Sequence, residues 1–392
     1  MTTARTLPNW FMYFPGTSPD HYRWSAALVG ALSMSPWGGA DIGDVDRVGR
    51  KLKDHVGDDE LWFQEWVNLG EEVRTLAERE QAQGHLLTAA GAYLRSSCYY
   101  QWGERFRTAK DSAGLEAYRA SVDAFHRYAE LTDRPKIEPV EVPYEGSSLP
   151  GYFVSPPYAG ARPLPCVVFF DGLDTTKELQ FVRGVSEILR RGVACLVMDG
   201  PGTGEAIRFR NFPLRYDYEV AGAATIDYLE TRPEVDANRI GVMAVSLGGY
   251  YASRCAAMEP RFKACIAWGA IWNYYETWKR RIDAAYNASL SVPGHHITWI
   301  FQVETPEQAL EKLENFPLDG VVQQMRCPFL LLHGEEDAQI PMEDAQALYN
   351  AVGSADKTLR VFTAAEGGAQ HCNRDHMTLG ITTIADWLAE KL

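Results

Sequence analysis

Hydrophobic residues recur every three or four positions through the first third of the chain. Residues 58–106 keep this spacing over several helical turns, and Gly84 lies where a turn would separate two antiparallel helices. Residues 112–131 repeat the pattern, and Ser112 stands where a helix N-cap is expected. The pattern therefore predicts an all-helical N-terminal domain over residues 1–135.

The hydrophobic pattern changes after residue 135. Residues 135–157 alternate like two strands around Gly146, which predicts a hairpin. Further on, short continuous apolar runs alternate with helical segments such as 177–192. Continuous rather than alternating apolar strands are typical of a sheet that is buried on both faces. We therefore predict an α/β fold with a mostly parallel twisted sheet over residues 136–392; the apolar runs are 166–172, 193–200, 239–246, 262–270, 328–334 and 358–364.

One interval interrupts this alternation of strands and helices. Residues 271–325 lie between two predicted strands and carry helical patterns of their own. A connection of that length above a parallel sheet is often functional. We predict a helical lid or cap insertion over these residues.

Ser246 stands between a predicted strand and a predicted helix. A serine at such a sharp turn is the pattern of a nucleophile elbow, in which the residues two before and two after must be small. Ala244 and Gly248 occupy these positions, with alanine in place of the more usual first glycine. The alternative is that Ser246 is an ordinary helix N-cap. In the elbow interpretation, the backbone N–H of Leu247 points toward the reacting oxygen.

An elbow serine predicts an acid and a histidine later in the chain, in that order. Asp337 follows the strand predicted at 328–334, and its spacing lets it reach across to a histidine; the neighbouring glutamates are the alternatives. His371 lies in a glycine-rich loop after the last predicted strand, whereas His376 falls where the terminal helix begins. We predict that Asp337 orients His371, which takes the proton of Ser246.

A second oxyanion donor is expected after the strand at 166–172. The backbone N–H of Leu173 is our candidate, and the preceding Asp171 is expected to orient the loop. The glycine-rich stretch 198–206 lacks the spacing and the lysine of a nucleotide-binding loop. It is expected to shape the rim of the site.

Composition and net charge argue against several classes of function. The chain has 392 residues and a formal net charge of −14, which argues against nucleic-acid binding and against an anionic membrane surface. It contains no apolar stretch long enough to span a membrane and no secretory signal, so we expect a cytoplasmic protein. The seven cysteines have no C-x-x-C spacing. The adjacent pair His295 and His296 is poorly suited to one ion, so neither a metal nor another cofactor is expected.

The stretches "DGPGTGE", "AVSLGGYYASR" and "HGEEDAQIP", behind a helical N-terminal segment, resemble a known family. The chain is similar to the dihydroxypseudooxynicotine hydrolase group of bacterial C–C bond hydrolases, to fungal polyketide-shortening hydrolases and to FrsA-like esterases. This resemblance implies an α/β-hydrolase fold, the triad and oxyanion donors named above, and a homodimer. It also implies that Glu276 takes part in C–C cleavage; the alternative is a surface ion pair with Lys279 or Arg280.

The expected function is serine-dependent hydrolysis of a small molecule, at a C–C bond beside a ketone on a hydroxylated aromatic or polyketide-like substrate. One alternative is a carboxylesterase or thioesterase that acts on an aromatic or acyl ester. Another is a non-catalytic protein-binding module. Aromatic residues around Glu276 would suit a flat substrate, although aromatic residues are more often simply core; the candidates are Trp272, Tyr274, Tyr275 and Trp278.

Overall fold

A computed structural model describes residues 14–16, 18–107, 110–132, 134–157, 162–283 and 292–392. The chain divides into two compact units. One contains residues 1–132 and 281–296, and the other contains residues 133–280 and 297–392. The predicted boundary at residue 135 and the lid over 271–325 stay predictions, because a compact unit need not be a functional domain. None of the described helices combines the length and apolar character needed to cross a bilayer.

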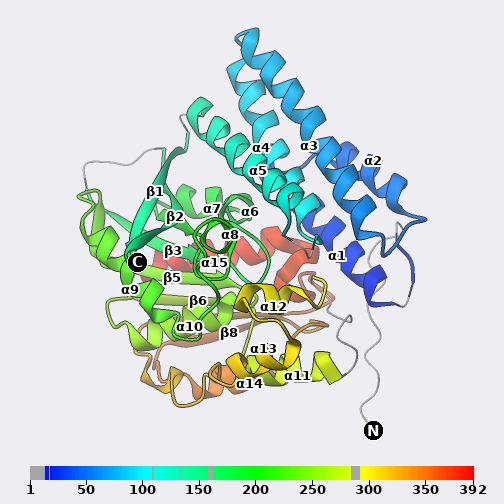
Figure 1. Cartoon of the computed structure of the whole chain (residues 1–392). Helices are drawn as coiled ribbons and strands as arrows, with labels where there is room; N and C mark the ends of the chain where they lie inside the picture. The colour runs from blue at the N-terminus through cyan, green and yellow to red at the C-terminus, as the bar shows by residue number, and fades with distance from the viewer. Residues whose placement is uncertain (1–13, 17, 108–109, 133, 158–161, 284–291) are drawn as a thin grey trace. The chain divides into compact units, whose positions relative to one another are not determined.

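The first unit is helical, as its hydrophobic pattern predicts (Figure 1). Helices α3 and α4 form a hairpin around Gly84, and α5 packs against α4. Asp111 rather than the predicted Ser112 caps α5, since its carboxylate accepts from the Gly114 N–H. The described helices of this unit are α1 (Pro19–Ser33), η1 (Ser35–Trp37), α2 (Ile42–Leu52), α3 (Asp59–Ala82), α4 (Leu86–Glu104) and α5 (Ser112–Leu131).

Aromatic side chains fill the core of this helical unit. Trp24, Trp62 and Trp66 are fully buried, and their ring centroids lie 4.8 Å and 5.7 Å apart along that order. Large aromatic rings bury more apolar area per residue than aliphatic side chains. The packing explains why apolar residues recur at helical spacing here.

The second unit is built on one eight-stranded sheet in the order β1-β2-β4-β3-β5-β6-β7-β8. The predicted hairpin around Gly146 forms β1 and β2, which are antiparallel, and β2 is antiparallel to β4. From β4 to β8 all neighbours are parallel, so the predicted mostly parallel sheet is confirmed. The strands are β1 (Lys136–Tyr144), β2 (Ser147–Ser155), β3 (Leu164–Phe170), β4 (Ala194–Met198), β5 (Val235–Val245), β6 (Ala264–Trp268), β7 (Phe329–Gly334) and β8 (Lys357–Phe362).

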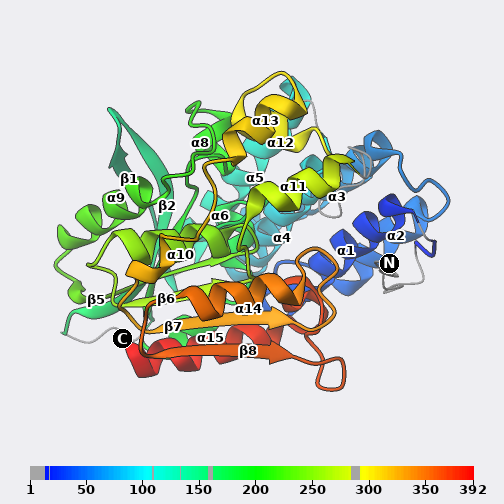
Figure 2. The same cartoon turned by 90° about the horizontal axis from the view of Figure 1, so that it is seen from below.

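Helices cover both faces of this sheet, which is why its central strands are continuously apolar. Helices α10 and α14 lie along one face of the strands and α15 along the other (Figure 2). The helical pattern at 177–192 forms two short helices instead of one, because Gly184 has a positive φ of 94° between them. The described helices of the second unit outside residues 271–325 are α6 (Lys177–Phe181), α7 (Val185–Arg190), α8 (Gly204–Arg208), α9 (Glu219–Glu230), α10 (Gly248–Met258), α14 (Met342–Ala351), η3 (His371–His376) and α15 (Met377–Lys391).

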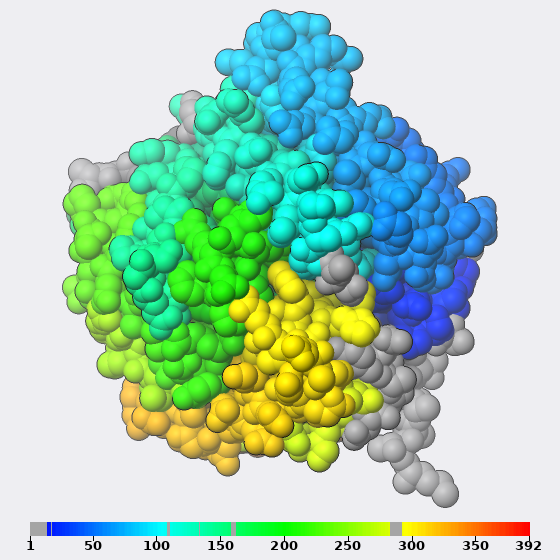
Figure 3. Space-filling model, in the orientation of Figure 1, coloured from blue at the N-terminus to red at the C-terminus, as the bar shows by residue number. Residues whose placement is uncertain are grey.

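The described part of the interval 271–325 contains short helices joined by turns and irregular segments. The part of it that belongs to the second unit packs on the segment after β4: the Leu214 N–H donates to the Ile300 carbonyl at 2.8 Å, and the Arg208 guanidinium lies 5.0 Å from the Trp299 ring. The yellow atoms of this part lie beside the green atoms of that segment in Figure 3. The described helices of the interval are α11 (Tyr274–Asp283), α12 (His296–Phe301), α13 (Pro306–Leu313) and η2 (Val322–Gln324).

Candidate active site

Ser246 lies in the turn between β5 and α10, as the sequence predicts. Its φ of 60° is rare for a residue with a side chain and is characteristic of a strained turn. A Cβ on Gly248 would stand 2.5 Å from both the Ala244 Cβ and the Asp171 carbonyl oxygen. The flanking residues are small because strand, helix and the loop after β3 meet here, and alanine fits at 244 only because 248 is glycine.

Gly249 is the tightest position of this turn, because a Cβ there would lie 1.9 Å from the Gly269 carbonyl oxygen. We expect Gly249→Ala to lower the free energy of unfolding by about 3 kcal/mol, the upper end for overpacking, since the obstacle is backbone. Denaturant unfolding measures this. Gly91→Ala in α4 is the control: its Cβ would meet nothing nearer than 3.8 Å. We expect Gly91→Ala to be neutral or stabilising by about 0.5–1 kcal/mol, and equal effects of the two changes would contradict the packing argument.

Three side chains from distant parts of the chain form one hydrogen-bonded row. The Ser246 Oγ lies 2.8 Å from the His371 Nε2, and the His371 Nδ1 lies 2.7 Å from the Asp337 Oδ2. Asp337 and His371 are buried, whereas Ser246 is partly exposed. Ser246 follows the carboxyl end of β5, Asp337 that of β7 and His371 that of β8. Open α/β sheets bind their ligands at this edge.

The charges of the buried pair reinforce each other. Burial alone would raise the pKa of Asp337, but the positive charge and hydrogen bond of His371 outweigh it and lower that pKa to about 2. Burial likewise disfavours a charged imidazole, yet the Asp337 carboxylate outweighs it and raises the pKa of His371. The Asp337 carboxylate also accepts from the Gln339 and Ile340 N–H groups at 2.8 Å and 3.0 Å, which fixes its direction. The arrangement strengthens His371 as a base for the Ser246 hydroxyl.

One predicted oxyanion donor is the next residue after this serine, and the other lies in a loop that runs past it. Leu247 is the N-cap of α10, and its N–H makes no hydrogen bond to a described backbone group. Leu173 follows Gly172, and a Cβ on Gly172 would lie 3.2 Å from the Ser246 Cβ, so the loop after β3 runs directly past the serine. Asp171 orients this loop, since its Oδ1 accepts from the Gly172 N–H at 2.6 Å and from the Thr175 hydroxyl.

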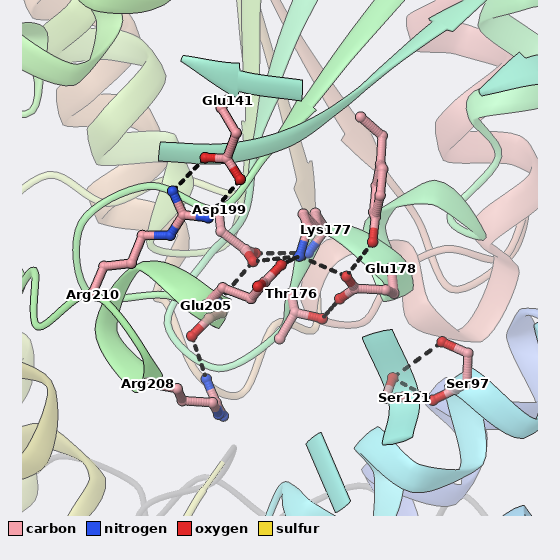
Figure 4. Close-up of polar contacts among 12 residues, drawn as sticks. Ser97, Ser121, Glu141, Thr176, Lys177, Glu178, Asp199, Glu205, Arg208 and Arg210 are labelled. Atoms are coloured by element: carbon pink, nitrogen blue, oxygen red, sulfur yellow. Dashed lines mark hydrogen bonds and ion pairs between the residues drawn. The ribbon is translucent and has the colours of Figure 1, made fainter. Parts of the chain in front are cut away.

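A buried lysine that no sequence motif marks, Lys177, stands where the same loop ends and α6 begins (Figure 4). The Lys177 Nζ lies 2.6 Å from Glu178, 3.0 Å from Asp199 and 2.6 Å from Glu205. The Asp199 carboxylate also accepts from the N–H groups of Lys177 and Glu205, at the starts of α6 and α8. These contacts tie the loop after β3 to the predicted rim segment after β4. No local pattern signals such a cluster, because its members come together only when the two strands pair.

Glu276 and the aromatic candidates lie around the start of α11. Glu276 is exposed, and the Arg280 Nε donates to its backbone carbonyl at 3.1 Å rather than to its carboxylate. Tyr274 and Trp278 are buried, with ring centroids 6.3 Å apart, whereas Trp272 and Tyr275 are partly exposed. Burial of Tyr274 and Trp278 is typical of core packing. The catalytic role of Glu276 and the substrate-binding roles of the four aromatic residues stay predictions.

The other histidines, the cysteines and possible metal ligands complete the description of the site. His376 is the N-cap of α15, and His333 is buried near the end of β7, so neither replaces His371 in the row. All seven cysteines are free. Within the described ranges, no group of three or more His, Cys, Asp or Glu side chains is arranged to hold a metal ion.

Comparisons with known proteins place the chain in a family and agree with its fold. The model of a family described as FrsA-like esterases matches residues 47–392. The 20-hydroxy-prefusarin hydrolase FUS2 of Gibberella moniliformis is 30% identical, over 86% of this chain and 88% of its own. The 2,6-dihydropseudooxynicotine hydrolase of Paenarthrobacter nicotinovorans is also 30% identical, over 84% of each chain. The crystal structure of a 2,6-dihydroxy-pseudo-oxynicotine hydrolase superimposes with a TM-score of 0.75 at 27% identity, over 92% of this chain and 95% of that one.

Proposed function

Because this chain belongs to the FrsA-like esterase family and is a hydrolase of the α/β-hydrolase fold, we propose that it works through a Ser246–His371–Asp337 triad. The observation that carries the proposal is the continuous row of hydrogen bonds from the Ser246 Oγ to the Asp337 carboxylate. Membership of an enzyme family favours catalysis over the protein-binding module considered from the sequence. A homodimer and a cytoplasmic location remain predictions.

The proposed reaction begins when the His371 Nε2 accepts the Ser246 proton and the Ser246 Oγ attacks a carbonyl carbon. The Leu173 and Leu247 N–H groups donate to the oxyanion that forms. Collapse of this intermediate breaks the bond to the leaving group, which receives the proton from the His371 imidazolium. Water then loses a proton to His371, attacks the acyl-serine and releases the carboxylic acid, and His371 returns the proton to Ser246.

We propose a ketone beside an aromatic or polyketide-like system as the substrate, cleaved at the C–C bond. The relatives named as hydrolases of 2,6-dihydropseudooxynicotine and 20-hydroxy-prefusarin support this class of small molecule. A carbanion is a poor leaving group unless a hydroxylated ring stabilises it or an acid protonates it as it departs. An ester is the second candidate, which the description of the family favours.

Glu276→Gln separates the two substrate classes. If Glu276 moves a proton in C–C cleavage, we expect turnover of an acylphenol ketone to fall about 10²-fold while turnover of an activated aryl ester is unchanged, because a phenolate leaves without an acid. Steady-state rates on both substrates measure this. Glu307→Gln, a similarly exposed carboxylate on α13, is the control and should change neither rate. Equal losses on ketone and ester, or no loss on either, would contradict the role of Glu276.

A further inference from the structure

The loop that carries His371 is held by side chains that follow the histidine in the chain. The Asp375 carboxylate accepts from three consecutive backbone N–H groups, those of Gly368, Ala369 and Gln370, at 2.8, 3.1 and 3.0 Å. The chain therefore closes back on itself around residue 371. This carboxylate is exposed, so it organises the outer side of the loop.

Asn373 holds the inner side of the same loop. It is buried, with 1% of its surface exposed, and both ends of its side chain are bonded. The Asn373 Nδ2 donates to the Gly368 carbonyl at 2.6 Å, and the Trp268 Nε1 donates to the Asn373 Oδ1 at 2.8 Å. Its backbone is left-handed, with φ 52° and ψ 32°, as is that of Cys372, with φ 54°. Asn tolerates this conformation better than most residues.

Trp268 is the last residue of β6 and contacts both the turn that carries Ser246 and the loop that carries His371. Its carbonyl oxygen accepts from the Ser246 backbone N–H at 2.8 Å, while its indole N–H reaches Asn373. Gly380 of α15 leaves room for this contact, since a Cβ there would lie 2.8 Å from the Asn373 Oδ1. A continuous path of hydrogen bonds therefore joins the serine turn to the histidine loop outside the triad itself.

We propose that Asn373 is a positioning residue that fixes the His371 imidazole between Ser246 and Asp337 by tying its loop to the end of β6. This inference rests on the proposed triad. Asn373 touches neither the hydroxyl nor the carboxylate of that triad, so its effect passes through the backbone of residues 371–373. Among the described residues, the polar side-chain groups that interact with the imidazole are the Ser246 hydroxyl, the Asp337 carboxylate and the neighbouring Cys372 thiol.

The test compares Asn373→Gly and Asn373→Ala on an activated aryl ester. Glycine adopts the left-handed backbone without strain and alanine does not, but both lose the two side-chain hydrogen bonds. We expect both variants to lose about 10²-fold in kcat, the cost of a misplaced catalytic group, with KM nearly unchanged. Because Asp337 raises the pKa of His371, an imidazole that drifts from Asp337 should also shift the acid limb of the kcat/KM profile to lower pH.

Asn211→Gly is the matched control. Asn211 is also left-handed, with φ 59°, and its side chain accepts one hydrogen bond from Gln302. We expect it to keep wild-type kcat and pH dependence. A lower melting temperature for Asn373→Gly with unchanged kcat and acid limb would overturn the proposal, since only a structural role would remain. Recovery of wild-type kcat in Asn373→Gly but not in Asn373→Ala would also overturn it, because backbone strain alone would then explain the loss.

Trp268→Phe tests the same contact from its other side, since it removes the indole donor and keeps an aromatic ring. If the two residues act through one hydrogen bond, the double variant with Asn373→Gly should be no slower than the slower single variant. Multiplied losses would contradict a shared path. Labelling of the wild-type protein with a fluorophosphonate separates the two proposals: an unlabelled Ser246 defeats the proposed function, whereas a labelled one with unaffected Asn373 variants defeats only this inference.

Discussion

Ser246→Ala is expected to reduce turnover at least about 10³-fold, on ester and ketone alike, without unfolding the protein. In the proposed mechanism this hydroxyl is the nucleophile in both reactions, so the nature of the leaving group should not matter. The hydroxyl also contributes little to the fold, because its described hydrogen bond is the one with the His371 Nε2. Single-turnover rates measure the loss, and thermal unfolding should give a midpoint close to that of the wild type.

Ser253→Ala is the control for this variant. Ser253 lies further along α10, is fully buried, and its hydroxyl has no hydrogen-bond partner among the described residues. Removal of an unsatisfied buried hydroxyl is neutral or slightly stabilising, so activity should stay at the wild-type level. Retained turnover in Ser246→Ala, with Ser253→Ala as active as the wild type, would end the triad proposal.

The strands, and the hydrogen-bonded row of Ser246, His371 and Asp337 on which the proposed triad rests, could be predicted because their signals are local. Each continuous apolar run from residue 166 onward became a strand of the parallel sheet, and the serine turn is marked by its small neighbours Ala244 and Gly248. Asp337 and His371 follow from chain order, since both stand just after strands that end at the same edge of the sheet.

What the sequence did not predict depends on contacts between distant segments. Asn373 contacts Trp268 only because the loop after β8 lies beside the end of β6. Lys177 contacts Asp199 only because β3 and β4 pair. The choice of Asp111 over Ser112 as the cap of α5 had a different cause: both residue types cap helices, and the backbone geometry decides between neighbours. Side chains that support the candidate site are therefore harder to predict than the three that form its hydrogen-bonded row.

Asp337→Asn should reduce the plateau of kcat/KM about 10⁴-fold, because the amide no longer holds the imidazole in the tautomer that accepts the Ser246 proton. It should also change the pH dependence. His371 acts as a base only when neutral, so activity rises with pH through the pKa of His371. The Asp337 carboxylate raises that pKa, and its removal moves the acid limb to lower pH. A pH series of kcat/KM measures both effects.

Glu336→Gln is the control for Asp337→Asn. Glu336 precedes Asp337 in the same loop but accepts from the Gln370 side chain at 2.9 Å instead of from the imidazole. It should keep the position of the acid limb. If the limb moved to higher pH in Asp337→Asn, or if Glu336→Gln caused the larger loss, Asp337 would not be the acid of the triad. The loss of kcat/KM and the shift of its acid limb must occur together in Asp337→Asn, because the contact that orients the imidazole also stabilises its positive charge.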